Sequence, residues 1–186
     1  MPSLASSLLL TSFRFEVRLI ASPDVVAGRQ RLPGAGEGYE PPQGQQILGG
    51  GAFQEVSGLD IEMDVQDYIE GGRNNGIVRR VGRAKFQPLV LKRGMFYPDE
   101  SDGKVNTELW HWMQRIINGV RPVRRYDGVI NVMSAEGEVR ASWMFDRGLP
   151  ARIKGPELNA KTGEIAIEEL TIAHEGLRLL PAEADA

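Results

Sequence analysis

The side chains that usually carry catalysis or metal binding are sparse in this sequence. It has no Cys and only two His, His111 and His174, among 186 residues. A disulfide scaffold, a Cys-ligated zinc or iron–sulfur site, a thiol nucleophile and a three-His metal site are therefore excluded. His174 stands beside Glu175, and such a pair can perform general acid–base chemistry, although a His that ends a strand more often meets a neighbouring chain. We predict no enzyme active site, no metal and no cofactor.

Charge is segregated in the middle of the chain, although the formal net charge is only -3. Six acidic and no basic residues lie between Glu55 and Glu70, and seven basic and no acidic residues lie between Arg73 and Arg93. Three readings stay open. The opposite charges can pair across neighbouring strands, the two patches can join different copies of the chain, or the basic block can bind nucleic acid. Phe86 is the only aromatic residue in the basic block, which disfavours stacking of bases.

The segments that must position these charges alternate apolar and polar residues, a pattern typical of half-buried β-strands. They cover residues 11–21, 53–69, 77–81, 83–92, 129–134, 138–146, 149–154 and 164–178. A turn at 71–76 and a short connection at 135–137 are typical of hairpins. Within 164–178 the apolar positions change phase, which predicts a β-bulge or a sharp twist at Glu168 and Glu169.

A single segment shows the 3.6-residue period of an amphipathic helix. Its apolar positions are Leu109, Trp112, Met113, Ile116, Ile117 and Val120. Asn106 or Thr107 can cap its start, and Gly119 or Pro122 ends it. We expect this helix to cover the apolar face of a sheet. The predicted fold class is mainly β: an antiparallel β-sandwich or barrel of about six to eight strands with one flanking α-helix.

The sequence predicts one domain over residues 11–180, between a flexible N-terminus at 1–10 and a flexible tail at 181–186. A long loop insert rich in Gly and Pro occupies residues 22–51. The longest near-apolar run, 4–10, is too short for a membrane anchor and lacks the basic region of a secretory signal. We therefore predict no membrane anchor.

Several short motifs, in order along residues 11–178, resemble the tail tube protein family of contractile phages and phage-like contractile injection systems. They are FQEVSGL at 53–59, YIEGGRN at 68–74, LKRG at 91–94, LWHW at 109–112, the strand with Trp143, GPELNA at 155–160 and IEELTIAHEGL at 167–177. Each motif is short, but together and in this order they are specific.

The resemblance implies a structural protein whose six copies form a ring. In the ring, β-hairpins from each subunit join one continuous β-barrel around a channel, and rings stack into an inner tube inside a contractile sheath. The implied partners are further copies of the chain, the sheath protein, baseplate or hub proteins, and a cargo or tape-measure protein in the lumen. Nucleic acid is implied only as a molecule that can pass through the lumen. Assembly is expected in the bacterial cytoplasm.

The insert 22–51 departs from the family pattern and leaves the exact role open. A specialised tube-initiator ring between baseplate hub and main tube is one alternative, and a secreted ring-forming effector or binding module is another. We expect residues 55–70 and 77–93 to pair as a barrel hairpin through the tip 71–76. The residues predicted to serve self-assembly are Asp60, Glu62, Asp64, Glu70, Gly71, Gly72, Arg73, Asn74, Arg79, Arg80, Arg83, Lys92, Arg93, Glu168, His174 and Glu175.

Overall fold

The computed structural model describes residues 10, 14–23, 47–48, 53–69, 71, 76–96, 103–161 and 163–180. These residues form ten β-strands and one α-helix. In chain order the elements are β1 (Phe15–Ala21), β2 (Ile47–Leu48), β3 (Phe53–Ser57), β4 (Ile61–Tyr68), β5 (Val78–Phe86), β6 (Leu89–Gly94), α1 (Glu108–Ile117), β7 (Tyr126–Met133), β8 (Val139–Lys154), β9 (Ile167–Ala173) and β10 (Gly176–Leu180). The mainly β class with one helix is confirmed.

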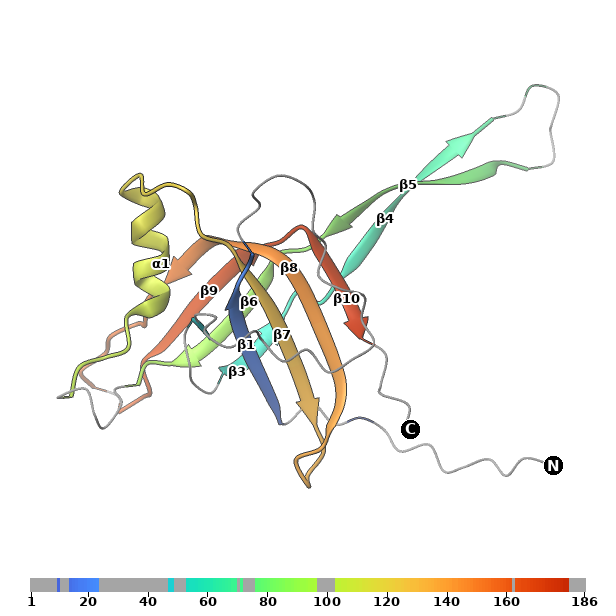
Figure 1. Cartoon of the computed structure of the whole chain (residues 1–186). Helices are drawn as coiled ribbons and strands as arrows, with labels where there is room; N and C mark the ends of the chain where they lie inside the picture. The colour runs from blue at the N-terminus through green and yellow to red at the C-terminus, as the bar shows by residue number, and fades with distance from the viewer. Residues whose placement is uncertain are drawn as a thin grey trace.

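Eight strands form one antiparallel sheet in the order β2-β1-β7-β8-β9-β6-β3, with β10 also paired to β8. The long strand β8 joins the two halves of this sheet. Its first part pairs with β7 and β10, and its part from Leu149 onward pairs with β9. The strand turns at Arg147, whose φ is 54° and whose backbone N–H donates to Asp127 Oδ1 at 2.7 Å. The sheet thereby folds over on itself (Figure 1).

The core lies where the apolar sides of the two halves meet. Phe145 and Leu19 come from one half, and Leu91 and Ile172 come from the other, and all four are at most 1% exposed. Burying a side chain of this size contributes roughly 1.5–3 kcal/mol. Gly128 and Gly148 make room for the Phe145 ring, because a Cβ on either would lie within 3 Å of its carbons.

Helix α1 covers one end of this core, as its sequence period predicts. Leu109 and Trp112 are buried in the common apolar cluster. Asn106 Oδ1 accepts a hydrogen bond from the N–H of Glu108 at 3.2 Å, so Asn106 supplies the side-chain contact at the helix start. Gly119 follows the helix with φ 76°, a value that glycine adopts readily.

The last predicted strand, 164–178, is wrong in two respects. It is two strands, β9 and β10, separated by a turn at His174 and Glu175. The bulge lies on β8 between Pro150 and Arg152, and not at residues 168–169. The reason is that Glu168 lies in the core on the same face as the apolar side chains that follow it, so the apolar phase of β9 never changes.

Two further expectations need correction. The end of the insert 22–51 is ordered, because Ile47–Leu48 pairs with β1 as strand β2. Residues 24–46 and 49–51 of that insert lie outside the described residues, as do 1–9 and 181–186 of the predicted flexible ends. The predicted strands 138–146 and 149–154 are one continuous strand, β8.

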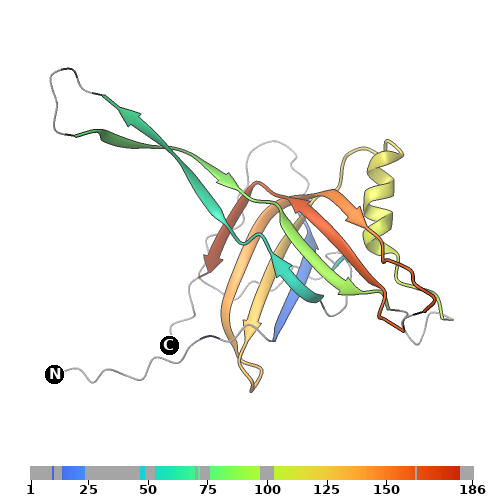
Figure 2. The same cartoon turned by 180° about the vertical axis from the view of Figure 1, so that it is seen from behind.

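Strands β4 and β5 leave the body as a separate two-stranded hairpin (Figures 1 and 2). The predicted strand 53–69 is therefore divided: β3 stays in the main sheet, and β4 departs after Gly58. At Gly58 φ is 87°, and a Cβ there would lie 2.2 Å from the carbonyl oxygen of Pro88. The predicted pairing of the two segments through the turn at 71–76 is confirmed, although residues 72–75 lie outside the described residues.

Candidate assembly surface

The part of the β4–β5 hairpin nearer the body has one apolar and one charged face. Its register places Ile61 opposite Phe86, Met63 opposite Ala84, and Val65 opposite Val81. The intervening positions pair Glu62 with Lys85 and Gln66 with Arg80. Because side chains directly opposite each other share a face, the first set forms an apolar strip on one face and the second a charged strip on the other. Toward the tip, the pair Asp67–Arg79 follows on the face of the apolar strip, and Tyr68–Val78 follows on the face of the charged strip.

The apolar face of the hairpin is open to solvent within a single subunit. Val81 is 73% exposed, Val65 59% and Ile61 48%. A contiguous apolar strip of this kind usually marks a protein contact. We define the hairpin surface as this strip together with the charged face behind it.

Opposite charges do pair between the two strands. Lys85 Nζ lies 3.0 Å from Asp64 Oδ1, and this hydrogen bond raises the pKa of Lys85. Arg79 lies 3.5 Å from Asp67 across the ladder. Pairing across neighbouring strands, the first of the three readings of the charge pattern, is therefore observed. Contact between copies through the same residues stays a prediction.

The predicted assembly residues fall into three places. The hairpin and its approach carry one group, the main sheet carries a second, and the turn between β9 and β10 carries a third. Gly71 is a turn residue at the far end of the hairpin. Glu70, Gly72, Arg73 and Asn74 lie outside the described residues. The hairpin group is Asp60, Glu62, Asp64, Arg79, Arg80 and Arg83; the sheet group is Lys92, Arg93 and Glu168; the turn group is His174 and Glu175.

Arg93 and Glu168 belong to the core and not to a surface. Each side chain is 1% exposed, and Arg93 Nε lies 2.6 Å from Glu168 Oε1. Trp110 of α1 donates its indole N–H to Glu168 Oε2 at 2.8 Å, and Arg93 Nη2 donates to Asn106 Oδ1 at 3.3 Å. These contacts tie α1 to β6 and β9. We therefore place this ion pair in the folding of the subunit and leave it out of the assembly surface.

Lys92 and Glu175 also find partners within the chain. Lys92 Nζ lies 2.9 Å from Glu55 Oε1. The carboxylate of Glu175 forms two ion pairs, Oε1 with Arg125 Nη1 at 2.6 Å and Oε2 with Arg147 Nε at 3.0 Å. The side chain of Glu175 is nevertheless 53% exposed, so it remains open to a neighbouring subunit.

His174 lies at the root of the hairpin. Its Nε2 is 3.1 Å from the carbonyl oxygen of Gln87, the residue that follows β5. Its ring centroid lies 5.6 Å from that of Phe86 and 5.7 Å from that of Phe145. The sequence placed His174 at a strand end but gave no sign that Gln87 or Gly58 would form this root, because both contacts join segments far apart in the chain.

The half-buried position of His174 predicts a loss of stability in acid. Desolvation lowers the pKa of His174 from its usual 6.5, against the opposing effects of the Gln87 carbonyl and the Asp146 charge. His174 in the unfolded chain therefore binds a proton more readily than His174 in the folded chain. The stabilisation is complete above the unfolded pKa and is lost as the pH falls through 6.5 toward the lowered folded value.

We expect the wild type to lose stability more steeply than His174→Phe between about pH 7.5 and pH 5.5, by at most about 1.4 kcal/mol per pH unit. Urea unfolding at a series of pH values and one fixed protein concentration measures this difference. Parallel pH profiles for the two proteins would contradict it.

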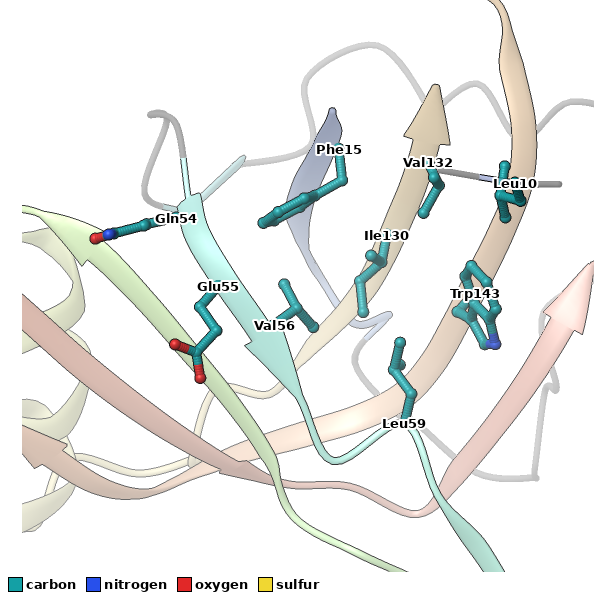
Figure 3. Close-up of a pocket in the computed structure, with 9 residues that line it drawn as sticks. All are labelled: Leu10, Phe15, Gln54, Glu55, Val56, Leu59, Ile130, Val132 and Trp143. Atoms are coloured by element: carbon teal, nitrogen blue, oxygen red, sulfur yellow. The ribbon is translucent and has the colours of Figure 1, made fainter. Parts of the chain in front are cut away.

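An apolar pocket of about 330 Å³ opens between the two halves of the sheet (Figure 3). Side chains from four strands converge on it, namely Phe15 of β1, Val56 of β3, Ile130 and Val132 of β7, and Trp143 of β8. The polar residues in the lining are Gln54 and Glu55, and Glu55 is bound to Lys92. Its lining contains no nucleophile paired with a base, so this pocket offers no catalytic constellation.

The residue ranges that the structure describes contain neither a candidate metal site nor a candidate membrane helix. Among those residues there is no cluster of three or more His, Asp or Glu side chains suited to a metal ion. No helix in them is long and apolar enough to cross a membrane.

Three solved structures share the fold at low sequence identity. A chain of the anti-feeding prophage baseplate, six-fold symmetrised, aligns with TM-score 0.66 and 21% identity over 94% of this chain and 97% of its own. A chain of the PVC extracellular contractile injection system, from its sheath-tube complex in the extended state, aligns with TM-score 0.64 and 21% identity over 94% and 93%. A chain of the anti-feeding prophage cap aligns with TM-score 0.63 and 20% identity over 97% of both.

Curated proteins with known function give no sequence match. The family described as T4-like virus tail tube protein gp19, in contrast, matches residues 11–178. This range contains the main sheet, α1 and the projecting hairpin, which is nearly the whole described structure. The chain therefore belongs to the T4-like virus tail tube protein gp19 family and is a structural subunit of a tail tube.

Proposed function

We propose that six copies of this chain close into a ring through their β4–β5 hairpins and that the rings stack into the inner tube of a contractile tail or injection system. The observation that carries the proposal is the projecting hairpin. Among the described residues of one subunit, nothing covers its apolar face and no further strand pairs with the outer edges of β4 and β5. The six-fold symmetry named for the similar baseplate structure supports the number of copies.

The two faces of the hairpin suit two different environments in such a ring. The apolar face packs against neighbouring subunits, which removes Val65 and Val81 from water. The charged face, with Glu62, Asp64 and Lys85, lines a water-filled channel. The free edges pair with hairpins of adjacent copies, and closure of the barrel removes edges that would otherwise favour aggregation.

The partners follow from this arrangement. A sheath protein encloses the tube, baseplate or hub proteins hold its first ring, and a cargo or tape-measure protein occupies the lumen. The similar PVC chain comes from a sheath-tube complex, which supports the first of these partners. Assembly takes place in the bacterial cytoplasm, and the finished particle is a phage tail or a phage-tail-like injection system.

Sedimentation and electron microscopy of the purified protein test the proposal. We expect the subunit to pass into rings, and then into stacked tubes, as its concentration rises. Six-fold class averages with a central channel are the expected images. A protein that stays monomeric at every concentration, with no rings on the grid, overturns the proposal. Rings that never stack would instead favour a secreted ring-forming effector.

A tube-initiator ring is the second candidate role. The similarity to a chain of the anti-feeding prophage baseplate favours it. The two roles differ in copy number and position, because an initiator occupies only the layer next to the baseplate. Cryo-electron microscopy of native particles, with this chain located along the tube axis, decides between them.

A further inference from the structure

The hairpin is joined to the body by two short connections. One runs from β3 through Gly58, and the other from β5 through Gln87 and Pro88 to β6. A Cβ on Gly58 would meet the Pro88 carbonyl, so the two connections touch at this point. In the described residues β4 and β5 pair only with each other and with no strand of the main sheet. The direction of the hairpin therefore depends on contacts at its root.

One side chain bridges the root and the body. His174 lies in the turn between β9 and β10, where its imidazole Nε2 meets the carbonyl oxygen of Gln87 at 3.1 Å. The imidazole also contacts Phe86, the last residue of β5, and Phe145 of the core. Phe86 itself packs against the core cluster. A polar and an aromatic contact thus hold the end of β5 to β8 and β9.

We propose that His174 is a positioning residue that fixes the direction in which the β4–β5 hairpin leaves the body and so holds the subunit in the geometry needed for ring closure. The first part of this inference, the direction of the hairpin, is independent of the proposed function. The second part, ring closure, rests on it. A ring of identical subunits closes when each interface repeats the same rotation. If the hairpin can swing at its root, the rotation between neighbouring subunits takes many values. Each association step must then fix the direction of the hairpin, which costs conformational entropy.

The two contacts of His174 can be separated by substitution. His174→Gln keeps an N–H donor near the Nε2 position and can still reach the Gln87 carbonyl. His174→Phe keeps an aromatic ring against Phe86 and Phe145 but removes the donor. We expect His174→Phe to loosen the hairpin and His174→Gln to retain most of its direction.

Distances within one subunit test the first part of the proposal without assembly. The chain has no Cys, so Gln66→Cys on the charged face of the hairpin and Asn118→Cys after α1 give two unique spin-label sites. The labelled proteins also carry Val81→Asp, which places a carboxylate in the exposed apolar strip and is expected to keep the subunits unassembled. We expect one narrow distance distribution with His174, a similar one with Gln at 174, and a clearly broader one with Phe. Equal widths in all three proteins overturn the proposal.

Assembly of the same variants without labels or Val81→Asp tests the second part. Loss of one hydrogen bond corresponds to about a fivefold change in an equilibrium constant. We therefore expect His174→Phe to need about a fivefold higher concentration for half-assembly, with His174→Gln closer to the wild type. Circular dichroism first establishes that each variant is folded. Absence of rings from the wild type counts against the proposed function and leaves the distance result unaffected, whereas equal assembly of all three proteins overturns the role of His174.

Discussion

Replacement of Glu168 by Ala is expected to lower the free energy of unfolding by about 3–5 kcal/mol. The substitution leaves the guanidinium of Arg93 in the core without its carboxylate, and an Arg side chain does not lose its proton to escape that cost. It also removes the acceptor of the Trp110 indole N–H, which joins α1 to β9. A loss of this size is a large share of the stability of a typical domain.

Urea unfolding measured at one fixed subunit concentration tests this expectation, since assembly adds stability by mass action. Glu169→Ala is the matched control, because Glu169 is the next residue of β9, lies 4.0 Å from Arg152 and has 23% of its side chain exposed, against 1% for Glu168. The double variant Arg93→Met/Glu168→Gln should recover most of the loss, since it removes both charges and keeps an acceptor for Trp110. A Glu168→Ala protein as stable as the Glu169→Ala control would show that the buried pair is not needed for folding.

Replacement of Val81 by Asp is expected to abolish ring formation and leave the subunit folded. Val81 is 73% exposed in the single subunit, so a carboxylate there stays hydrated and folding changes little. In the proposed ring the same position is buried against a neighbour. A buried carboxylate without a partner opposes association by several kcal/mol in addition to the lost burial of Val81.

Sedimentation of Val81→Asp at the concentrations that assemble the wild type measures the effect, and circular dichroism reports the fold. Gln66→Asp is the control, because it adds the same negative charge on the opposite, charged face, where Gln66 lies opposite Arg80. We expect that control to assemble. Rings from Val81→Asp would show that the apolar strip is not the subunit contact, and equal loss in the control would point to net charge instead of the strip.

Residue patterns predicted much of the fold because they record which side of an element is buried. The 3.6-residue period around Trp112 predicted α1 and its burial, and the alternation between 59 and 66 predicted which side chains of β4 share a face. The same reasoning failed at β9. The change of apolar phase predicts a bulge at Glu168 and Glu169, whereas the structure buries Glu168 without one, because Arg93, 75 residues away in the chain, neutralises its charge. The residue pattern of one strand cannot reveal which residue of another strand will pair with a buried charge.

The candidate surface divides in a similar way. The alternating segments 55–70 and 77–93 and the turn at 71–76, together with the family resemblance, predicted a hairpin. The blocks of acidic and basic residues are compatible with pairing across its ladder, but by themselves they left two other readings open. Its departure from the sheet at Gly58, and the His174 contact at its root, were not predictable. Both depend on close approach to Gln87 and Pro88, which only the folded chain brings about.

The sequence by itself determined the class of the protein: a β-rich structural subunit without the thiols or clustered imidazoles of many enzymes, with ordered motifs that resemble tail tube proteins. These properties follow from composition and local order along the chain. The tertiary structure alone decided that Arg93 and Glu168 lie in the core, that the hairpin projects with its apolar face exposed in the described residues, and that His174 contacts the root of the hairpin. Burial and exposure depend on contacts between distant segments, and they decide whether a charge serves folding or assembly.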